Sequence, residues 1–262
     1  MSNVLAETKN GKMIVNDKDK YVGASLIKYG EFSESEGDLF RSLIKPGMTV
    51  IDVGANYGAH TLLFSRLVGN TGHVYAFEPQ VQVYNCLCGS LALNNLTNVT
   101  AVCAAVGVSG EKVKYVELDY NQENNFGGYS FEQIEDGQEM DVVPLNVPCH
   151  FIKIDVEGME LAVVKGAAEM IREYQPVMYV EADRPKKNEE LFKFIRSLGY
   201  EIYWHSAPFF NTNNINQDKE NLFEGIASIN VLCVPKDITI HGLTVAHASD
   251  WHEHFKSSNG DA

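Results

Sequence analysis

A loop that carries two glycines, between an apolar run and a helical pattern, most constrains the fold of this chain. The apolar run ends in Asp52, Gly54 and Gly58 follow, and large apolar residues then recur at helical spacing. A second apolar run ends in an acid, Glu78, 20 residues after Gly58. This order of strand, glycine loop, helix, strand and acid is typical of a unit that binds an adenosine-containing cofactor. The glycines let backbone N–H groups approach the ligand, and the acid can accept hydrogen bonds from ribose hydroxyls.

The spacing of this loop discriminates between cofactors. Dinucleotide-binding loops use G-x-G-x-x-G to admit a pyrophosphate, whereas here Gly54 and Gly58 enclose three residues, so the spacing disfavours a dehydrogenase. No Gly-Lys-Ser/Thr of a phosphate-binding loop follows. Acids beside the loop would repel a diphosphate but suit a positive sulfonium and an ammonium group. The sequence therefore indicates S-adenosylmethionine. The alternative is a turn that binds no ligand, which Glu78 after the second strand disfavours.

The composition excludes several classes of protein. The chain has 262 residues, 45% of them hydrophobic, which suffices for one large α/β domain. Its 21 basic and 35 acidic residues give a net charge of −14, which disfavours a nucleic-acid partner. No segment approaches the ~18 consecutive apolar residues of a membrane span. Residues 1–10 lack the basic start and apolar core of a signal peptide. We therefore expect a cytoplasmic protein.

The five cysteines do not indicate a metal centre. Cys103, Cys149 and Cys233 lie in or beside apolar runs, as expected for buried thiols in a reducing compartment. Cys86-Leu-Cys88 has one residue between its cysteines, unlike the C-x-x-C of zinc sites, and lies within a helical pattern. We therefore expect no resident metal.

Predicted strands and helices alternate along most of the chain. Strands are expected over 11–15, 49–53, 73–77, 99–106, 151–154, 177–180, 200–204 and 229–234. Helices are expected over 33–45, 57–67, 81–93, 160–173 and 191–198. Extra strands over 112–118 and 140–145 flank a polar loop at 121–130. This alternation predicts an α/β fold, a doubly wound, mostly parallel sheet with a hairpin-like edge.

No linker or internal repeat marks off a second large domain. We expect an N-terminal cap with a short strand and a helix over residues 1–45 and a cofactor-binding domain over 46–240. The polar end of the chain suggests a loosely held tail over 241–262.

Four acids stand at the ends of four predicted strands. They are Asp52, Glu78, Asp155 and Glu181. In a doubly wound sheet, ligands bind outside the carboxyl ends of the strands, so these acids are expected to gather at one site. The alternative for Asp155 and for Glu157 is a structural one, in which each neutralises the N-terminus of the following helix.

Three motifs make the chain similar to a known family. They are VIDVGANYGAHTLLFSRL from Val50, VYAFEP from Val74 and FIKIDVEGMELAVVKGA from Phe151, of which the Ile-Asp-Val-Glu-Gly-x-Glu element is the specific part. The chain resembles the FkbM family of S-adenosylmethionine-dependent methyltransferases over roughly residues 20–235. The resemblance implies the Rossmann-like class I methyltransferase fold, a seven-stranded sheet of order 3-2-1-4-5-7-6 with strand seven antiparallel.

The resemblance also implies a cofactor site. The glycine loop would hold the methionine part of S-adenosylmethionine, Glu78 the ribose, and Asn94 with the segment at 103–105 the adenine. Asp155 would lie beside the transferable methyl group, with Glu157 on the substrate side. The residues expected around the cofactor are Asp52, Gly54, Ala55, Asn56, Gly58, Glu78, Pro79, Asn94, Ala104, Ala105 and Asp155.

Catalysis would require a base if the acceptor is a hydroxyl. The catalytic candidates are Asp155, Glu157 and His60. The two acids are favoured because they follow the expected strand at 151–154, and His60 has the alternative of lying on a helix surface. A divalent ion on Asp155 and Glu181 is an alternative, but no clear third ligand follows Glu181.

The acceptor site is expected to include Glu181, Asn125, Phe126 and Trp204. Trp204 is part of an aromatic segment, 203–214, which could form a wall of the acceptor site; the alternative is a packed edge hairpin and an ordinary loop. The polar loop at 121–130 is either a lid over the site or a disordered insertion. Family members are best known for O-methylation, so the expected reaction is O-methylation of a hydroxyl on a sugar, glycan or polyketide-like small molecule. An N-methyltransferase and a non-catalytic S-adenosylmethionine-binding protein remain alternatives. The sequence leaves open whether the chain forms a homodimer.

Overall fold

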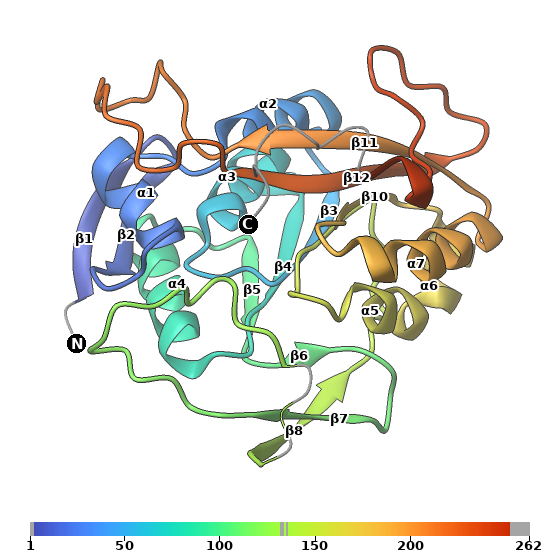
Figure 1. Ribbon diagram of the computed structural model, residues 1–262, viewed down its shortest axis with the longest axis horizontal. Helices are drawn as coiled ribbons and strands as arrows, with labels where there is room; N and C mark the ends of the chain where they lie inside the picture. The colour runs from blue at the N-terminus through green and yellow to red at the C-terminus, as the bar shows by residue number, and fades with distance from the viewer. Residues whose placement is uncertain (1–2, 132–133, 135, 252–262) are drawn as a thin grey trace.

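A seven-stranded mixed sheet forms the centre of the molecule (Figure 1). The structure, a computed structural model, describes residues 3–131, 134 and 136–251. The strands of the sheet are β3 (Thr49–Val53), β4 (His73–Phe77), β5 (Val99–Val102), β9 (Phe151–Ile154), β10 (Val177–Glu181), β11 (Tyr200–Pro208) and β12 (Ala227–Pro235). They lie in the order β11-β12-β10-β9-β3-β4-β5, with β12 antiparallel to both neighbours and the others parallel. The predicted class I methyltransferase order is confirmed.

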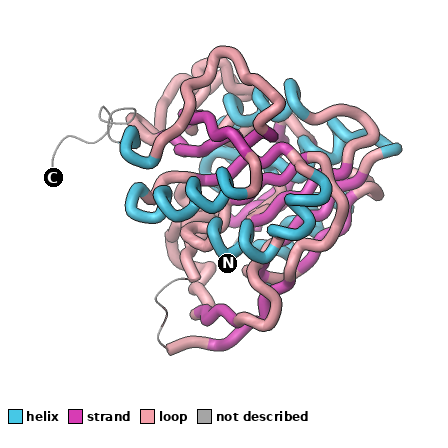
Figure 2. The backbone as a smooth tube through the Cα atoms, turned by 90° about the vertical axis from the view of Figure 1, so that its right-hand side faces the viewer, coloured by secondary structure: helices cyan, strands magenta, loops and turns pink. Residues whose placement is uncertain are grey.

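Helices cover both faces of this sheet (Figure 2). One face carries α2 (Glu34–Leu43), α3 (Ala59–Val68) and α4 (Val81–Leu93), and the other carries α5 (Glu160–Gly166), α6 (Ala168–Tyr174) and α7 (Pro185–Ser197). Successive strand residues alternate between the faces: Val50 packs with α2 and α3, whereas Ile51 packs in the cluster of α5, α6 and α7. Because helices cover both faces, the side chains that point to either face are apolar, and the central strands therefore appear in the sequence as continuous apolar runs.

The N-terminal part is more ordered than the sequence indicated. The predicted strand at 11–15 is β2 (Gly11–Asn16), but it pairs with an unpredicted strand, β1 (Asn3–Thr8). The hairpin packs against α4, where the Ile14 N–H donates to Ser90 Oγ at 2.9 Å. The helix α1 (Val22–Tyr29) was also not predicted; its N-cap residue, Tyr21, makes no side-chain capping hydrogen bond, so the usual start signal is absent.

The prediction of one continuous strand over 99–106 is wrong, because the structure has two separate strands there. The chain leaves the central sheet after β5, and β6 (Ala105–Val106) pairs instead with β8 (Gln138–Val143), which also pairs with β7 (Lys112–Tyr115). This small sheet lies below α5 in Figure 1. Cys103 falls at the switch and is exposed, so its predicted burial is wrong, whereas Cys149 and Cys233 are buried as predicted.

Two late segments pack over the sheet and the N-terminal elements. The loop between β11 and β12 lies over α1 (Figure 1), and Tyr29 Oη donates to the Glu220 carbonyl at 2.8 Å. Residues 244 and 246 of the expected tail bond to the β11 backbone, and the short 3-10 helix η2 (Ala248–Asp250) follows. Residues 252–262 of that tail lie outside the described residues. Among the helices described, none combines the length and apolar character needed to cross a bilayer.

Candidate functional site

A cavity of about 350 Å³ opens at the carboxyl ends of the central strands. Strands β3, β4, β9 and β10 supply the residues at its base, and residues of α1, the loop at 125–131 and the start of β12 complete its walls. This is the edge of a doubly wound sheet where ligands bind, since the crossovers diverge there. In this chain the four strand-end acids predicted from the sequence all line it.

The glycine loop joins three strands at the base of the cavity. The N–H groups of Gly54 and Ala55 both donate to the Phe77 carbonyl, at 3.0 and 2.9 Å. Gly54 has φ +80°, and a Cβ there would lie 1.8 Å from the carbonyl oxygen of Asp155. Only glycine therefore allows the loop after β3 to touch the loop after β9.

Glu78, at the end of β4, presents a buried carboxylate to this cavity. Its Oε2 accepts the Asn56 N–H and its Oε1 accepts the Gln80 N–H, each at 2.9 Å. Burial raises the pKa of Glu78 to about 7, although the two N–H groups act in the opposite direction. These hydrogen bonds fix both oxygens at the cavity wall and leave each with capacity for a further donor.

Lys153 forms the electrostatic centre of the site and was missed by the sequence analysis. It lies on β9 and is 3% exposed. Its Nζ is 2.9 Å from Asp155 Oδ2 and 4.0 Å from Asp52 Oδ1. Burial lowers the pKa of Lys153, but Asp155, Asp52 and Glu36 together outweigh it and raise the pKa above its ordinary value. The signal was a lysine inside the apolar run Phe-Ile-Lys-Ile, since buried lysines occur with partners.

Asp52 is fully buried next to this lysine. Its Oδ2 accepts the Thr61 hydroxyl at 2.6 Å, whereas its Oδ1 has no hydrogen-bond partner among the described residues. Burial raises the pKa of Asp52, and Lys153 opposes that shift. This Oδ1 lies 4.0 Å from Lys153 Nζ, too far for a hydrogen bond, so it can still accept one from a cationic group of a ligand.

Three carboxylates meet on the other side of Lys153, and we call them the acidic cluster: Asp155, Glu157 and Glu181. One oxygen from each lies within 4.8 Å of the others. Arg184 Nη2 contacts Glu157 Oε2 at 2.7 Å, and Glu181 Oε2 has no hydrogen-bond partner among the described residues. Burial, and then Asp155, raise the pKa of Glu157 to about 8 and the pKa of Glu181 well above its ordinary value.

His60 lines the cavity from α3 and is buried, so the alternative of a helix-surface residue is wrong. Its Nε2 is 3.3 Å from Glu36 Oε2, while Glu36 Oε1 accepts the Asn230 side-chain N–H at 2.7 Å. Burial, and then Lys153, lower the pKa of His60 well below its ordinary value. Glu36 was missed because it stands in an acid-rich segment that reads as a solvated helix start.

The buried Glu36 makes stability depend on pH. Burial raises its pKa from 4.5 to about 7, so the folded protein keeps a proton that the unfolded chain loses between these values. The stabilisation from this group is therefore complete below pH 4.5 and is lost as the pH rises through 7. Glu36→Gln removes this dependence. When the pH is raised from 4.5 to 8, the free energy of unfolding in urea should shift in favour of the variant, relative to the wild type, by about 1–3 kcal/mol. Glu189→Gln, at an exposed position, should show no such change.

Aromatic side chains form the outer part of the cavity, and we call Tyr21, Phe32 and Phe209 the aromatic wall. Phe209 lies 5.1 Å from the Phe32 ring and 6.2 Å from the Tyr21 ring, measured between centroids. Tyr21 and Phe32 come from the N-terminal part, so the cap contributes to the site. The aromatic segment at 203–214, which was expected to form a wall of the acceptor site, contributes Phe209 to the lining of the cavity.

Most residues predicted for the site line this one cavity. They are His60, Asp52, Gly54, Ala55, Asn56, Glu78, Pro79, Ala104, Ala105, Asn125, Asp155, Glu157 and Glu181. Gly58, Asn94, Phe126 and Trp204 do not line it. Gly58 precedes α3, and a Cβ there would lie 2.6 Å from Leu87 Cδ1, so its role is close packing.

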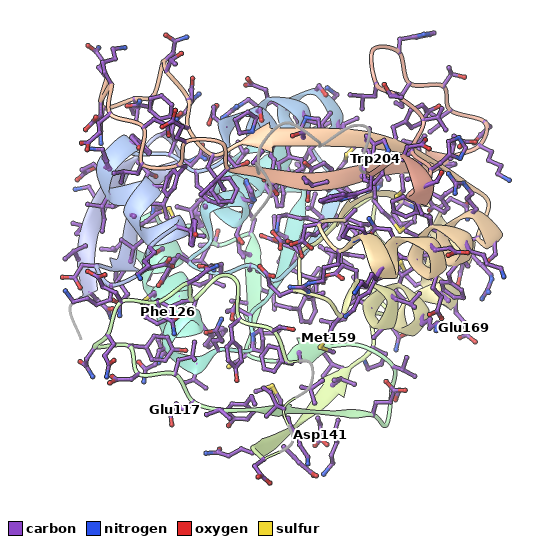
Figure 3. All side chains as sticks on the ribbon, in the orientation of Figure 1. Glu117, Phe126, Asp141, Met159, Glu169 and Trp204 are labelled. Carbon is purple, nitrogen blue, oxygen red and sulfur yellow. The ribbon has the colours of Figure 1, made fainter. Side chains whose placement is uncertain are left out.

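The other three side chains have partners elsewhere. Asn94 ends α4 and bonds to the Lys12 backbone, with its Oδ1 3.0 Å from the Lys12 nitrogen. Phe126 is fully buried against Tyr120, and Trp204 packs on Phe192 of α7, with ring centroids 4.7 and 5.4 Å apart. Figure 3 shows Phe126 on the α4 side and Trp204 on the α7 side, well apart. The structure thus places these three side chains away from the lining of the cavity.

A comparison with protein families gives one match. The family model described as "Methyltransferase FkbM domain" matches residues 52–202, more than half of the 262 residues. That range runs from the acid at the end of β3 into β11 and holds all four strand-end acids. A comparison with curated proteins gave no significant match.

Solved structures resemble this one at low sequence identity. A methyltransferase FkbM from Methylobacillus flagellatus KT is 17% identical, with 76% of this chain and 50% of that chain covered and a TM-score of 0.47. A SAM-dependent O-methyltransferase from Thermotoga maritima is 13% identical (79% and 67% covered, TM-score 0.48). Trm5b from Pyrococcus abyssi is 11% identical (90% and 56% covered, TM-score 0.50). The chain thus spans about half the length of two of them, and the likeness concerns the fold.

Proposed function

The chain belongs to the FkbM family of S-adenosylmethionine-dependent methyltransferases, and on this basis we propose that it methylates a hydroxyl group of a sugar, glycan or polyketide-like acceptor. The observation that carries the proposal is that one cavity holds the glycine loop, the acidic cluster and the aromatic wall. Aromatic faces stack on sugars and flat rings, and carboxylates accept hydrogen bonds from hydroxyl groups. The net charge of −14 favours such a small neutral acceptor over a nucleic acid.

The cofactor would occupy the part of the cavity around the glycine loop. Glu78 would accept hydrogen bonds from the ribose hydroxyls, and Ala104 and Ala105 would flank the adenine. Asp52 would offer its buried Oδ1, which makes no hydrogen bond among the described residues and lies 4.0 Å from Lys153 Nζ, to the positively charged methionine part. Bound S-adenosylmethionine supplies an electrophilic methyl group on a sulfonium. The fit rests on the lining of the cavity, where the glycine loop lies beside the buried Glu78 carboxylate, whose two oxygens are held by backbone N–H groups.

The protein's part in the reaction is to position the acceptor and remove a proton. Positioning the acceptor oxygen close to the methyl group supplies much of the rate. As the oxygen–carbon bond forms, the carbon–sulfur bond breaks and the hydroxyl proton passes to a base. Glu157 suits this role, because burial raises its pKa to about 8, near the working pH of such an enzyme. Asp155 remains the alternative base, and Lys153 compensates its charge at 2.9 Å.

The first test is cofactor binding. Glu78→Ala should weaken binding of S-adenosylmethionine and S-adenosylhomocysteine by about 1–3 kcal/mol, since it removes the acceptor of the ribose hydroxyls. This corresponds to a rise in Kd of roughly 5- to 150-fold, measurable by isothermal titration.

The control is Glu169→Ala, because Glu169 lies on the outer side of α6, away from the cavity (Figure 3). It should bind both compounds like the wild type. An unchanged Kd in folded Glu78→Ala would overturn the ribose assignment. Failure of the wild type to bind either compound would overturn the proposed reaction.

A further inference from the structure

The acidic cluster offers more than a base, and we propose that Asp155, Glu157 and Glu181 together bind a divalent cation of the Mg²⁺ or Mn²⁺ type. The sequence suggested Asp155 and Glu181 without a third ligand. The structure supplies it: Glu157, with φ +56°, turns back so that its carboxylate joins the other two. Oxygen ligands alone are the set that these hard cations prefer.

The spacing of the oxygens fits one cation. An ion with metal–oxygen distances of about 2.1–2.4 Å holds any two of its ligands at most ~4.2–4.8 Å apart. One oxygen from each carboxylate lies within 4.8 Å of the others. The three oxygens are therefore near enough for one ion to bind them once the side chains move inward.

Glu181 gives a second and independent indication of a ligand. The residue is 9% exposed, and its buried Oε2 has no hydrogen-bond partner among the described residues. An ionised carboxylate without a partner is costly to bury, and this one also faces Asp155 and Glu157. A cation would satisfy that oxygen and offset the repulsion between the three groups.

The two neighbouring cations of the protein leave room for an added ion. Lys153 contacts Oδ2 of Asp155, and Arg184 contacts Oε2 of Glu157. Each of these contacts uses one oxygen, so the second oxygen of each group can face the ion. The same two cations also lie near Asp52, 4.0 Å from Lys153, and Asp183, 3.8 Å from Arg184, so carboxylates outnumber the protein's cations here before the divalent ion is added.

A cation here would define the acceptor more closely, an extension that rests on the proposed function. Mg²⁺ takes six ligands and keeps open positions for water or substrate oxygens. With three positions held by the cluster, two neighbouring oxygens of a vicinal diol could replace water. The preferred acceptor would then be a molecule with adjacent hydroxyl groups. Glu157 would act as a ligand and not as the base, and the coordinated hydroxyl, made more acidic by the ion, would lose its proton to water.

Titration with Mn²⁺ alone tests the site without an acceptor. Electron paramagnetic resonance of free Mn²⁺ should show one bound ion per wild-type chain, displaced by excess Mg²⁺. Glu181→Gln keeps the shape of the side chain and should weaken Mn²⁺ binding by at least about tenfold. Glu157→Gln is the second variant, and both are checked for folding by thermal melting. Glu78→Gln, an equally buried acid on the same cavity, is the matched control and should bind Mn²⁺ like the wild type.

The same proteins titrated with S-adenosylmethionine separate the two proposals. Loss of Mn²⁺ binding in Glu181→Gln with cofactor binding kept, and the converse in Glu78→Gln, would support both. No Mn²⁺ binding by the wild type, or equal binding by the wild type and both cluster variants, would overturn the cation site even if the cofactor binds. Mn²⁺ binding without cofactor binding would uphold the cation site and overturn the reaction.

Discussion

Replacing Gly54 by alanine should lower the melting temperature by ~8–16 °C and abolish cofactor binding. The alanine Cβ would lie 1.8 Å from the Asp155 carbonyl oxygen, a backbone atom that cannot move without shifting the loop after β9. A non-glycine residue at φ +80° adds about 1–3 kcal/mol of strain. The forced shift adds about 1–3 kcal/mol more. A total near 4 kcal/mol corresponds to the stated fall in a chain of this size.

Gly110→Ala separates strain from collision. Gly110 also has positive φ, +85°, but nothing lies within 4 Å of a Cβ added there. This variant should lose only the strain contribution, and it should bind S-adenosylmethionine like the wild type. Calorimetry and isothermal titration on both variants measure the difference. Equal melting temperatures for the two would show that the loops after β3 and β9 do not touch as described.

Replacing Lys153 by methionine should destabilise the protein by about 3–5 kcal/mol, because it leaves buried carboxylates without their cation. The fully buried Asp52 at 4.0 Å and the partly exposed Asp155 at 2.9 Å both lose their cationic partner. Burial already raises the pKa of Asp52 and Lys153 opposes that shift, so without the lysine Asp52 should take up a proton on folding and the loss should be larger at pH 8 than at pH 5. Chemical unfolding at both pH values gives the two free energies.

Lys112→Met is the matched control for this substitution. Lys112 also contacts two carboxylates, Glu139 and Asp141, but its side chain is 54% exposed. Exposed pairs of this kind contribute about 0–1 kcal/mol. A similar loss in both variants would mean that Lys153 acts through packing and not through its charge.

The part of the site nearest the cofactor could be predicted because its information is local. Asp52, Gly54 and Glu78 belong to consecutive elements, so the order of strand, turn and acid places them at one edge of the sheet. The alternation of strands and helices then fixes that edge as the carboxyl ends. The family resemblance added the strand order, which the structure confirms.

The rest of the site depends on contacts between distant segments. Glu36 meets Asn230 and His60 only after α2 packs across the sheet, and nothing in its own neighbourhood marks it. Trp204 shows the opposite failure: an aromatic segment was visible, but which of its residues lines the cavity was not, and the residue that does is Phe209, directly after β11. The alternation of a strand sends Trp204 into the cluster with α7, while Tyr203 faces the other side.

The aromatic wall has a consequence for how the chain folds during synthesis. Tyr21 and Phe32 come from the N-terminal part of the chain and Phe209 from the segment after β11. The hydrogen bonds that join these parts span long stretches of sequence: Glu31 to Asn211 across 180 positions and Tyr29 to Glu220 across 191. Chains emerge from the ribosome N-terminus first, and contacts between distant residues form late. The strands that carry Asp52 and Glu78 are made long before the loop that carries Phe209. A nascent chain can thus assemble the glycine-loop end of its cavity while the opposite end still lacks a side, so the aromatic wall, the part proposed to bind the acceptor, is completed last.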